Sequence, residues 1–450
     1  MGDYANGKEI VLLFDYYFTE SQDLHKSFQL AGKNYPAVVI EEDGFLPENV
    51  ISVYGFFLGD FKKAENIPGK PKYFNQITVP DYWEISANNN SGKIHDLNKE
   101  RGRIFFAEPK NKRLVKVVDW LDENGVVRSS DHYNRYGALY ARTIFNAKGQ
   151  KVNKAYFSVE GKEIIVENYV TGDIVLNDGE LIQIFHTKTD FVLYFMKKAG
   201  FLNSKLYFNS LSTPFFVSQR MPSERKEDIL FWQEPIKDAI PGNMQIILNG
   251  QSNRTNKIMV QKRAAYDRLI RLGASKDFVE QLGYVYPFER QNGYKPEVLI
   301  CTNSDRIAHC EKLIRELPEM HFHIAALTEM SSKLMSLGTY ENVTLYPGVK
   351  ITILDELFDT CDFYFDINYE NEIVSAVRQA FLHNQLIFAF KDTLHHIEYV
   401  TDEYTYTLEE VERMISDIKM ILLEPQFMDA YLDMQKEWAM MESVETYSNL

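Results

Sequence analysis

The sequence is short of cysteine, of long apolar runs and of basic charge. Its three cysteines, Cys301, Cys310 and Cys361, are too few for a disulfide framework, so we expect buried thiols in a reducing compartment. No apolar run reaches the roughly 18 residues that a membrane helix needs. The formal net charge of −15 disfavours nucleic acid and anionic lipid as long-range partners. These absences argue against small disulfide-rich, membrane-spanning and nucleic-acid-binding proteins.

The sequence also lacks a targeting segment and a metal-ligand pattern. Residues 1–9, MGDYANGKE, are acidic and polar, unlike a secretory signal peptide, so we expect a cytoplasmic protein. His321 and His323 alternate on a predicted strand, and His395 and His396 fall in a predicted loop. Neither pair has further ligands at the spacing of a metal site, so we expect packed or surface histidines and no bound metal.

What is present is the composition of a globular protein. The 450 residues are 45% hydrophobic and 25% charged, which suffices for two or three domains of ordinary size. Aromatic residues make up 14% of the chain, a content that suits a carbohydrate- or peptide-binding surface. The use of Tyr and Phe to pack strands is the simpler explanation.

The chain opens with a β-α-β pattern. Residues 9–17, KEIVLLFDY, form a continuous apolar run that predicts a buried parallel strand, and residues 36–40 predict a second. Between them Thr19 or Ser21 can cap a helix that ends at Gly32. The turn after the first strand holds no glycine, so we expect no phosphate-binding loop and no nucleotide in this domain.

The pattern changes between residues 70 and 190. Short segments of alternating polarity are separated by turn pairs such as Asn124-Gly125 and Lys148-Gly149, which predicts antiparallel hairpins joined into a meander. An open meander leaves strand edges that must be paired or covered, and this makes it a candidate for joining a partner. A sheet that packs on its own domain is the equally weighted alternative.

Alternating strands and helices return after residue 190. The segments LYFNS, DILFWQEP and NMQIILNG complete the first α/β domain, and residues 261–282 predict a helix that leads onward. A second α/β unit begins at Pro296, where Asn303, Ser304 or Asp305 can cap the helix after the strand EVLICT. The predicted domains are an N-terminal Rossmann-like domain at 1–69 and 191–290, an inserted meander at 70–190, a C-terminal Rossmann-like domain at 291–425 and a C-terminal helix at 426–450.

Residues 342–390 follow the order strand, glycine, short helix, strand, acidic loop, helix and strand, which resembles the donor-binding half of retaining glycosyltransferases. Those enzymes carry a Glu-x7-Glu element in the acidic loop. Here YENEIVSAVR places Glu370 at the first acid and Arg378 at the second. Arginine has no acceptor for the ribose hydroxyls that the second acid binds. Glu372 could offer a displaced second acid, but that would need a partner eight residues later, at Ala380.

The neighbouring loops are also poor in the residues that a nucleotide sugar requires. The loop after EVLICT lacks the usual Gly-Arg pair, and the loop after HFHIAAL offers no clear phosphate-binding lysine. We therefore expect a degenerate donor site with no catalytic residue, in which Glu370 is a solvated carboxylate at a helix N-terminus. The remnant of the donor site comprises Ser304, Thr328, Glu370, Asn371, Glu372 and Arg378.

The first α/β domain offers a candidate acceptor cleft. In one large group of glycosyltransferases two doubly wound domains face one another, and ligands bind at the carboxyl ends of the strands. Trp232 ends the strand DILFW and would stack on a sugar or peptide there, although such a tryptophan is more often part of the core. The candidate acceptor residues are Tyr16, Trp232 and Gln233.

Several segments together carry a resemblance that covers nearly the whole chain. They are LFDYYFTESQDLHKSF, EEDGFLPENVISVYGFFLGD, DILFWQEPI with PGNMQIIL, HIAALTEMSSKL and DINYENEIVSAVRQAF. In these segments the chain is similar to the stabilising B subunits of bacterial O-GlcNAc transferases that modify serine-rich-repeat adhesins.

The resemblance implies a fold, a partner and a role. The fold would be α/β, with two Rossmann-like domains facing across a cleft as in GT-B glycosyltransferases and an antiparallel β-meander inserted in the N-terminal domain. The partner would be a homologous catalytic A subunit, two of each in a heterotetramer, that uses UDP-GlcNAc, so this chain would need no cofactor.

The implied role is to stabilise that subunit and to help hold the adhesin polypeptide. The complex would work at the cytoplasmic side of the membrane, at most peripheral to it, before export by accessory Sec components. Two alternatives stay open: an active retaining glycosyltransferase with an atypical nucleotide-sugar site, and a scaffold without acceptor contact.

Overall fold

The computed structural model describes residues 10–177, 179, 181–222 and 226–450. They form two compact units, an N-terminal unit that ends at Leu282 and a C-terminal unit that begins at Gly283. Residues 1–9, on which the expectation about a signal peptide rests, lie outside the described residues. Within the described ranges, no helix is long and apolar enough to cross a membrane.

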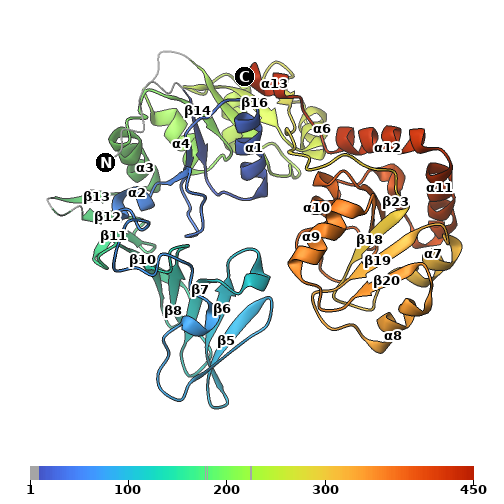
Figure 1. The fold of residues 1–450 in the computed structure, drawn as a ribbon. Helices are drawn as coiled ribbons and strands as arrows, with labels where there is room; N and C mark the ends of the chain where they lie inside the picture. The colour runs from blue at the N-terminus through green and yellow to red at the C-terminus, as the bar shows by residue number, and fades with distance from the viewer. Residues whose placement is uncertain (1–9, 178, 180, 223–225) are drawn as a thin grey trace. The chain divides into compact units, whose positions relative to one another are not determined.

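The N-terminal unit is built on a seven-stranded parallel sheet (Figure 1). The first apolar run forms β1, and all of its residues are buried. The strand order is β17-β16-β15-β14-β1-β2-β3, so segments from both sides of the meander share one sheet. The strands are β1 (Ile10–Phe14), β2 (Ala37–Val39), β3 (Val50–Ser52), β14 (Lys205–Phe208), β15 (Asp228–Trp232), β16 (Thr255–Val260) and β17 (Val279–Gln281).

Two predictions about the helices of this unit are wrong. The first helix begins at Thr19 with Phe18 at its N-cap, and no side chain caps it. The helix predicted over 261–282 ends at Arg271, because Gly273 takes a left-handed φ of 89° and the chain then continues as β17. The helices are α1 (Thr19–Leu30), α2 (Gly55–Leu58), α3 (Lys188–Lys198), α4 (Thr213–Arg220), α5 (Gly242–Leu248) and α6 (Arg263–Arg271).

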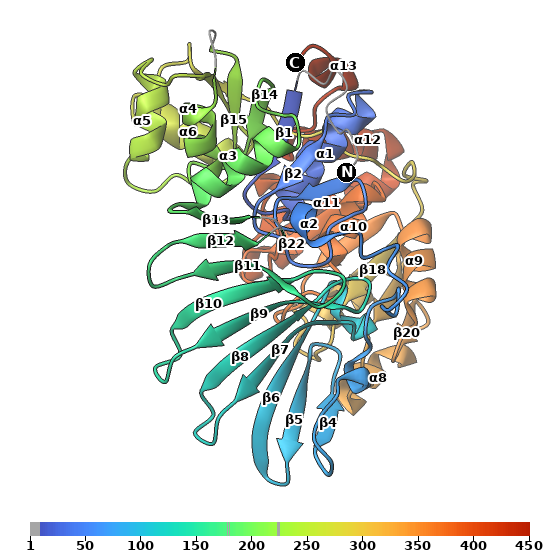
Figure 2. The ribbon, with the colours of Figure 1, turned by 90° about the vertical axis from the view of Figure 1, so that its left-hand side faces the viewer.

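The chain between β3 and β14 forms a separate ten-stranded antiparallel sheet, in which strands adjacent in the chain are adjacent in space (Figure 2). Gly125, Gly149 and Gly161 take positive φ at hairpin turns, where a side chain would strain the backbone. The strands are β4 (Glu84–Ala87), β5 (Ser91–Asp96), β6 (Lys99–Phe106), β7 (Val115–Leu121), β8 (Val127–Tyr133), β9 (Leu139–Phe145), β10 (Lys151–Phe157), β11 (Glu163–Asn168), β12 (Ile174–Asn177) and β13 (Ile182–Phe185).

This antiparallel sheet is shared between two hydrophobic clusters. Tyr156 and Ile165 belong to the same cluster as the parallel sheet and α3. The Tyr54 and Tyr156 rings stack with their centroids 4.4 Å apart. Farther along the sheet, Ile104 and Val118 belong to a separate cluster. One end of the meander is therefore part of the core of its own unit, whereas the other end builds a core by itself.

The C-terminal unit contains a six-stranded parallel sheet in the order β20-β19-β18-β21-β22-β23. Helices α9 and α10 lie on one face of the sheet, and α7 and α11 lie on the other (Figure 1). All three cysteines are free and buried, as predicted. The strands are β18 (Glu297–Cys301), β19 (His321–Ala325), β20 (Val343–Tyr346), β21 (Phe363–Asp366), β22 (Leu386–Phe390) and β23 (Thr405–Tyr406).

Two helices of this unit begin later than their sequence patterns predict. Helix α7 begins at Cys310, several residues after the candidate caps at 303–305, and α10 begins at Ala376, where the pattern predicts a start at Glu372. His309 and Ser375, which precede them, take left-handed φ values of 48° and 52°, so the residues upstream stay in loops. Left-handed Met440 likewise interrupts the predicted C-terminal helix. The helices are α7 (Cys310–Glu316), α8 (Ser332–Met335), α9 (Ile351–Thr360), α10 (Ala376–Leu382), α11 (Val411–Leu423), α12 (Pro425–Trp438) and α13 (Val444–Ser448).

Candidate functional site

Each parallel sheet has a point where the strand order reverses, between β1 and β14 in one unit and between β18 and β21 in the other. The loops that follow two such strands diverge, and ligands of open α/β sheets bind in the crevice between them. We call residues 302–309 the β18 loop and residues 367–375 the β21 loop. Most of the predicted site residues lie just after strands, so both reversal points are candidate sites.

In the C-terminal unit the two loops bond to each other across the reversal point. Ile307 in the β18 loop and Asn368 in the β21 loop form an isolated antiparallel bridge. The backbone N–H of Tyr369 donates to the carbonyl of Arg306 at 3.1 Å. These bonds lie where a ligand would separate the loops, so the backbone of the protein itself joins the two sides of the crevice.

An ion pair adds to this closure. Nη1 of Arg306 lies 2.8 Å from Oε1 of Glu370, and the guanidinium lies 5.4 Å from the ring centroid of Tyr369. Glu370 is exposed, as predicted, but it does not lie at a helix N-terminus. Because Ser375 is left-handed, α10 begins only at Ala376, and the Glu370 carboxylate pairs with the β18 loop instead.

Two histidines in the loop after β22 contact carboxylates at the end of β21 and in the β21 loop. Nδ1 of His395 lies 2.6 Å from Oδ1 of Asp366. His396 lies between two carboxylates, 2.6 Å from Glu372 and 3.1 Å from Glu398. The pattern predicted only packed or surface histidines, because nothing in the sequence places these carboxylates beside the rings.

His396 gives this segment a pH dependence that can be measured. Hydrogen bonds to Glu372 and Glu398 raise the pKa of His396 to about 10. The folded chain therefore holds a proton that the unfolded chain, with an ordinary histidine pKa of about 6.5, releases at neutral pH. The stabilisation is complete below about pH 6.5 and is lost as the pH rises through about 10.

Replacing His396 with glutamine is expected to lower the Tm most at about pH 6 and to leave it unchanged above about pH 10. Thermal unfolding of the variant and the wild type across this range measures the effect. A Tm difference that stays constant with pH would show that the proton on His396 does not contribute to stability.

The other predicted donor-site residues are scattered over the β18 loop, the β21 loop, α10 and the loop after β19. Nη1 of Arg378, in α10, donates to the hydroxyl of Tyr399 at 2.7 Å. The Ser304 hydroxyl accepts a backbone N–H within the β18 loop at 3.0 Å. Thr328 and Asn371 are exposed. The structure thus brings Ser304 into the closed crevice and leaves Thr328 and Asn371 at the surface.

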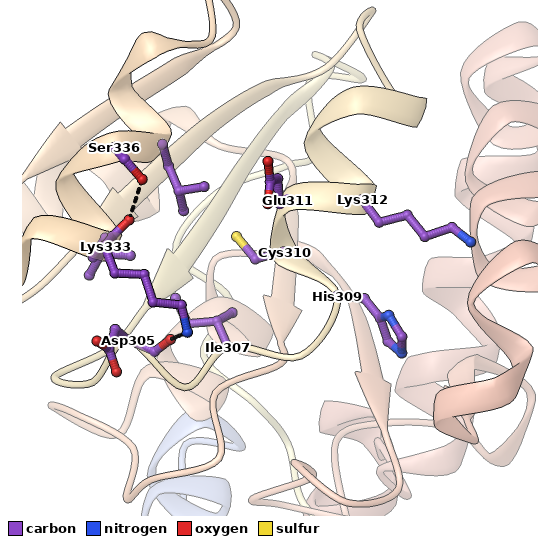
Figure 3. Close-up of a pocket in the computed structure, with 10 residues that line it drawn as sticks. Asp305, Ile307, His309, Cys310, Glu311, Lys312, Lys333 and Ser336 are labelled. Atoms are coloured by element: carbon purple, nitrogen blue, oxygen red, sulfur yellow. Dashed lines mark hydrogen bonds between the residues drawn. The ribbon is translucent and has the colours of Figure 1, made fainter.

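A pocket of about 260 Å³ lies beside the β18 loop, where α7 and α8 meet it (Figure 3). Nζ of Lys333 donates to the carbonyl of Asp305 there at 3.3 Å. None of the residues described as its lining belongs to the predicted donor site. In the described part of the chain, no group of three or more His, Cys, Asp or Glu side chains is arranged to hold a metal ion.

In the N-terminal unit the corresponding loops meet through side chains. Oδ1 of Asn209, after β14, accepts the backbone N–H of Asp15, after β1, at 2.9 Å. The Ser210 hydroxyl donates to the Asp15 carboxylate at 3.2 Å. No backbone–backbone hydrogen bond joins these two loops among the residues that the structure describes. This reversal point therefore lacks the backbone bridge that closes the other one.

The three predicted acceptor residues differ in exposure. Tyr16 is 47% exposed, whereas Gln233 is 8% exposed and donates to the side chain of Gln261 at 2.8 Å. Trp232 is 4% exposed and belongs to the main hydrophobic cluster. The expectation that Trp232 stacks on a sugar or peptide is wrong, because β15 is buried along its whole length. Only Tyr16 is placed to meet a ligand directly.

Sequence reasoning missed two residues of these sites. Arg306 lies in a loop whose sequence lacks the usual Gly-Arg pair, yet it pairs with Glu370. Phe18, which is 66% exposed, was passed over as part of a turn without glycine. Both residues come shortly after a predicted strand. Attention to every charged or aromatic side chain at such positions would have found them.

The fold is that of a known glycosyltransferase. A structure described as the pneumococcal O-GlcNAc transferase GtfA in complex with UDP and GlcNAc covers 99% of this chain and 98% of its own, with a TM-score of 0.51 and 10% identity. At that identity the match shows the fold alone. The chain is thus an α/β protein with parallel sheets and the fold of a glycosyltransferase.

Closer relatives define the family. The chain matches the GtfB N-terminal domain at residues 11–57, the GtfB middle domain at 83–186, the GtfB third domain at 188–272 and the GftB/GlyA-F C-terminal domain at 298–435. A relative from Streptococcus agalactiae is 43% identical over 98% of both chains. Its name is UDP-N-acetylglucosamine--peptide N-acetylglucosaminyltransferase stabilizing protein GtfB. A crystal structure of a GtfA/B complex bound to UDP and GlcNAc holds a chain that matches with a TM-score of 0.91 and 39% identity, again over 98% of both chains. This chain belongs to the GtfB family of stabilizing proteins.

Proposed function

We propose that this chain is the non-catalytic subunit that stabilises a homologous catalytic partner. The partner is an O-GlcNAc transferase that places the first GlcNAc on Ser and Thr of a serine-rich-repeat adhesin. The observation that carries the proposal is the closed crevice of the C-terminal unit, where the β18 and β21 loops form a backbone bridge. The names of its relatives and the GtfA/B complex support the same role.

A nucleotide sugar would meet three obstacles in that crevice. Arg378 stands at the second acid position and offers no acceptor to the ribose hydroxyls. Glu370 is paired with Arg306, which is the weakest of the three obstacles because both side chains are exposed and solvent screens the pair. The backbone bridge would also have to open, which breaks the hydrogen bond from the N–H of Tyr369 to the carbonyl of Arg306. These obstacles favour a site that has lost its donor.

We assign docking of the catalytic partner to the antiparallel sheet. Ala155, Val166, Val175 and Ile184 stand directly opposite one another on β10, β11, β12 and β13. Residues directly opposite in a sheet share a face, so these four form a continuous stripe that we call the apolar row. Ile184 is 59% exposed, and Ile182 on the same strand is 68% exposed. The other three residues of the row are half-buried. A partly exposed apolar face that ends on an edge strand is suited to binding another protein.

We assign the acceptor polypeptide to the reversal point of the N-terminal unit. Half-buried Asp15 and exposed Ser212 provide carboxylate and hydroxyl groups there, and Tyr16 provides exposed aromatic surface. These groups match the hydroxyls and backbone amides of a serine-rich chain. We further propose a complex with two copies of each subunit at the cytoplasmic side of the membrane, where modification would precede export by the accessory Sec system.

Turnover of UDP-GlcNAc on a serine-rich peptide tests the proposal. We expect no turnover by this chain alone and more turnover by the catalytic partner when the two are mixed. The variant Arg378→Glu restores the acid at the second position. It is still expected to be inactive alone, because the backbone bridge and the Arg306–Glu370 pair stay in place. Turnover by the isolated wild-type chain would contradict the proposal and favour an active transferase with an atypical site.

A further inference from the structure

Positive charge gathers at one end of the antiparallel sheet, in three segments that we call the basic patch, residues 68–74, 108–114 and 134–138. They carry six basic side chains and one acidic side chain, whereas the whole chain carries 49 basic and 64 acidic ones. The acidic Glu108 is 77% exposed and lies 3.6 Å from Nζ of Lys110, so it offsets one charge of the six. The basic residues are Lys70, Lys72, Lys110, Lys112, Arg113 and Arg135.

Backbone contacts bring the three segments together from distant parts of the sequence. Tyr73 and Leu114 form an isolated antiparallel bridge that joins the first segment to the second. A β-carbon on Gly137 would lie 2.5 Å from the carbonyl oxygen of Lys70, so the third segment lies against the first. The basic patch is therefore assembled by the fold, since no single run of the sequence holds all of its charges.

The two arginines of the basic patch bond to the protein itself. The Arg113 guanidinium lies 5.9 Å from the ring centroid of Phe74 and donates to Oδ1 of Asn89 at 3.0 Å. Nη1 of Arg135 donates to the carbonyl of Leu46 at 2.8 Å. Lysine is a compact charge on a flexible stem, so the exposed lysines suit a diffuse layer of negative charge more than one phosphate in a fixed geometry. The exposed lysines are Lys70, Lys110 and Lys112.

Apolar groups accompany these lysines. Tyr73 is 38% exposed, and its ring centroid lies 4.7 Å from that of Phe74. Pro68 and Pro109 in the same segments are exposed. An aromatic ring with a polar tip among lysines is typical of the interface between a bilayer and water. Nucleic acid is recognised mainly by arginine forks, which are engaged within the protein here, so the patch favours a lipid surface.

The basic patch lies apart from the surface assigned to the catalytic partner. Its segments lie beside β6, β7 and β9, whereas the apolar row runs over β10 to β13. Figure 2 shows β4 to β7 at the end of the antiparallel sheet away from the parallel sheet. Charges are screened beyond about 8 Å at physiological ionic strength, so the net charge of −15 does not cancel attraction at this place.

We propose that the basic patch binds the headgroups of a bilayer that contains anionic phospholipid. The exposed lysines attract the lipid phosphates, and the Tyr73 ring lies among the headgroups. This inference rests on the proposed place of the complex at the cytoplasmic side of the membrane, and it gives this chain a contact of its own with that surface. Binding of this kind is reversible and weakens as the ionic strength rises.

Flotation of the full-length chain with vesicles tests the proposal. We expect binding to vesicles of phosphatidylcholine mixed with phosphatidylglycerol and none to phosphatidylcholine alone. Replacing Lys110 and Lys112 together with glutamine is expected to weaken binding about 25-fold, because each lysine near an anionic bilayer contributes a factor of about five. The control replaces Lys99 and Lys148 with glutamine. These two exposed lysines lie at the opposite end of the strands, so the loss should stay below about twofold.

Equal losses for the two double variants would show that binding follows the net charge and would overturn the proposal. It would also be overturned if the wild-type chain bound neither vesicle or if the Lys110/Lys112 variant lost no affinity. Binding of an RNA oligonucleotide but of neither vesicle would assign the basic patch to nucleic acid instead.

Turnover on a serine-rich peptide in solution, with the catalytic partner added, is measured on the same variants and is expected to be unchanged. If the proposed function failed, the gain in turnover on mixing would be absent for the wild-type chain as well. If only the basic patch failed, that gain would remain and vesicle binding alone would be missing.

Discussion

Replacing Ile184 with aspartate is expected to abolish co-purification of this chain with its catalytic partner. Ile184 ends the apolar row on edge strand β13 and is 59% exposed. The carboxylate of an aspartate at this position would therefore stay hydrated in the free chain. In a complex formed over the apolar row, the same carboxylate would be buried without a partner. Burial of a polar group without a hydrogen bond costs about 2–7 kcal/mol, which corresponds to a loss of at least about 30-fold in affinity.

A matched control separates docking from a general effect of added charge. Leu97, between β5 and β6, is 87% exposed and lies outside the apolar row. Leu97→Asp is therefore expected to co-purify normally, and the Tm of both variants should stay near that of the wild type. If Ile184→Asp still co-purified, or if Leu97→Asp failed to the same extent, the partner would not dock on the apolar row.

Removing the Asp228 carboxylate is expected to have the largest effect on stability. Asp228 begins β15 and is fully buried, 2.8 Å from Nε of Arg254. It also accepts bonds from the Ser218 hydroxyl at 2.7 Å and from the backbone N–H of Leu206 at 2.8 Å. Asp228→Ala would leave a buried guanidinium without its anion, which destabilises a protein by about 3–5 kcal/mol.

Urea unfolding of Asp228→Ala measures this loss, and an exposed pair provides the comparison. Glu48 lies 2.7 Å from Lys62, but the two side chains are 53% and 60% exposed. Glu48→Ala should leave the unfolding midpoint almost unchanged, because solvent screens an exposed ion pair. Similar midpoints for the two variants would mean that the Asp228–Arg254 pair is not important for stability.

The C-terminal unit also has a buried aspartate–arginine pair at the N-terminal end of a strand. Asp362, just before β21, is fully buried and pairs with Arg290. It also accepts the backbone N–H groups of Gly293 at 3.0 Å and Lys295 at 2.7 Å. In each unit a buried aspartate thus fixes the chain beside a central strand. Neither pair was predicted, since the arginine comes from a distant part of the sequence.

Local patterns predicted the elements whose form depends on neighbours in the chain. The apolar run after residue 9 became the fully buried β1. Asn124-Gly125 and Lys148-Gly149 became hairpin turns because glycine takes positive φ there without strain. His321 and His323 share a face of β19, and their ring centroids lie 4.9 Å apart. A period of two residues or a turn dipeptide acts within a few residues, so the sequence alone is enough to see it.

The predicted starts of α7 and α10 were wrong because a left-handed residue before each helix decides where the helix begins. Left-handed His309 and Ser375 stop each helix from extending toward the preceding strand. Neither residue is a glycine, so composition carried no signal that the helix would begin late. The residues before each helix belong to the β18 and β21 loops, which form the backbone bridge across the crevice. An error of a few residues in the predicted helix starts therefore concealed this bridge.

By itself, the sequence determined that this is a two-unit α/β protein with a strand-rich insertion, and that Arg378 stands where a donor site needs an acid. Those conclusions depend on periodicity and on the chemistry of single side chains. Only the tertiary structure decided that Arg306 neutralises Glu370, that His396 lies between two carboxylates and that Trp232 belongs to the core. Each of these outcomes depends on a contact between segments far apart in the chain, and a contact of that kind exists only after the sheet has brought the segments together.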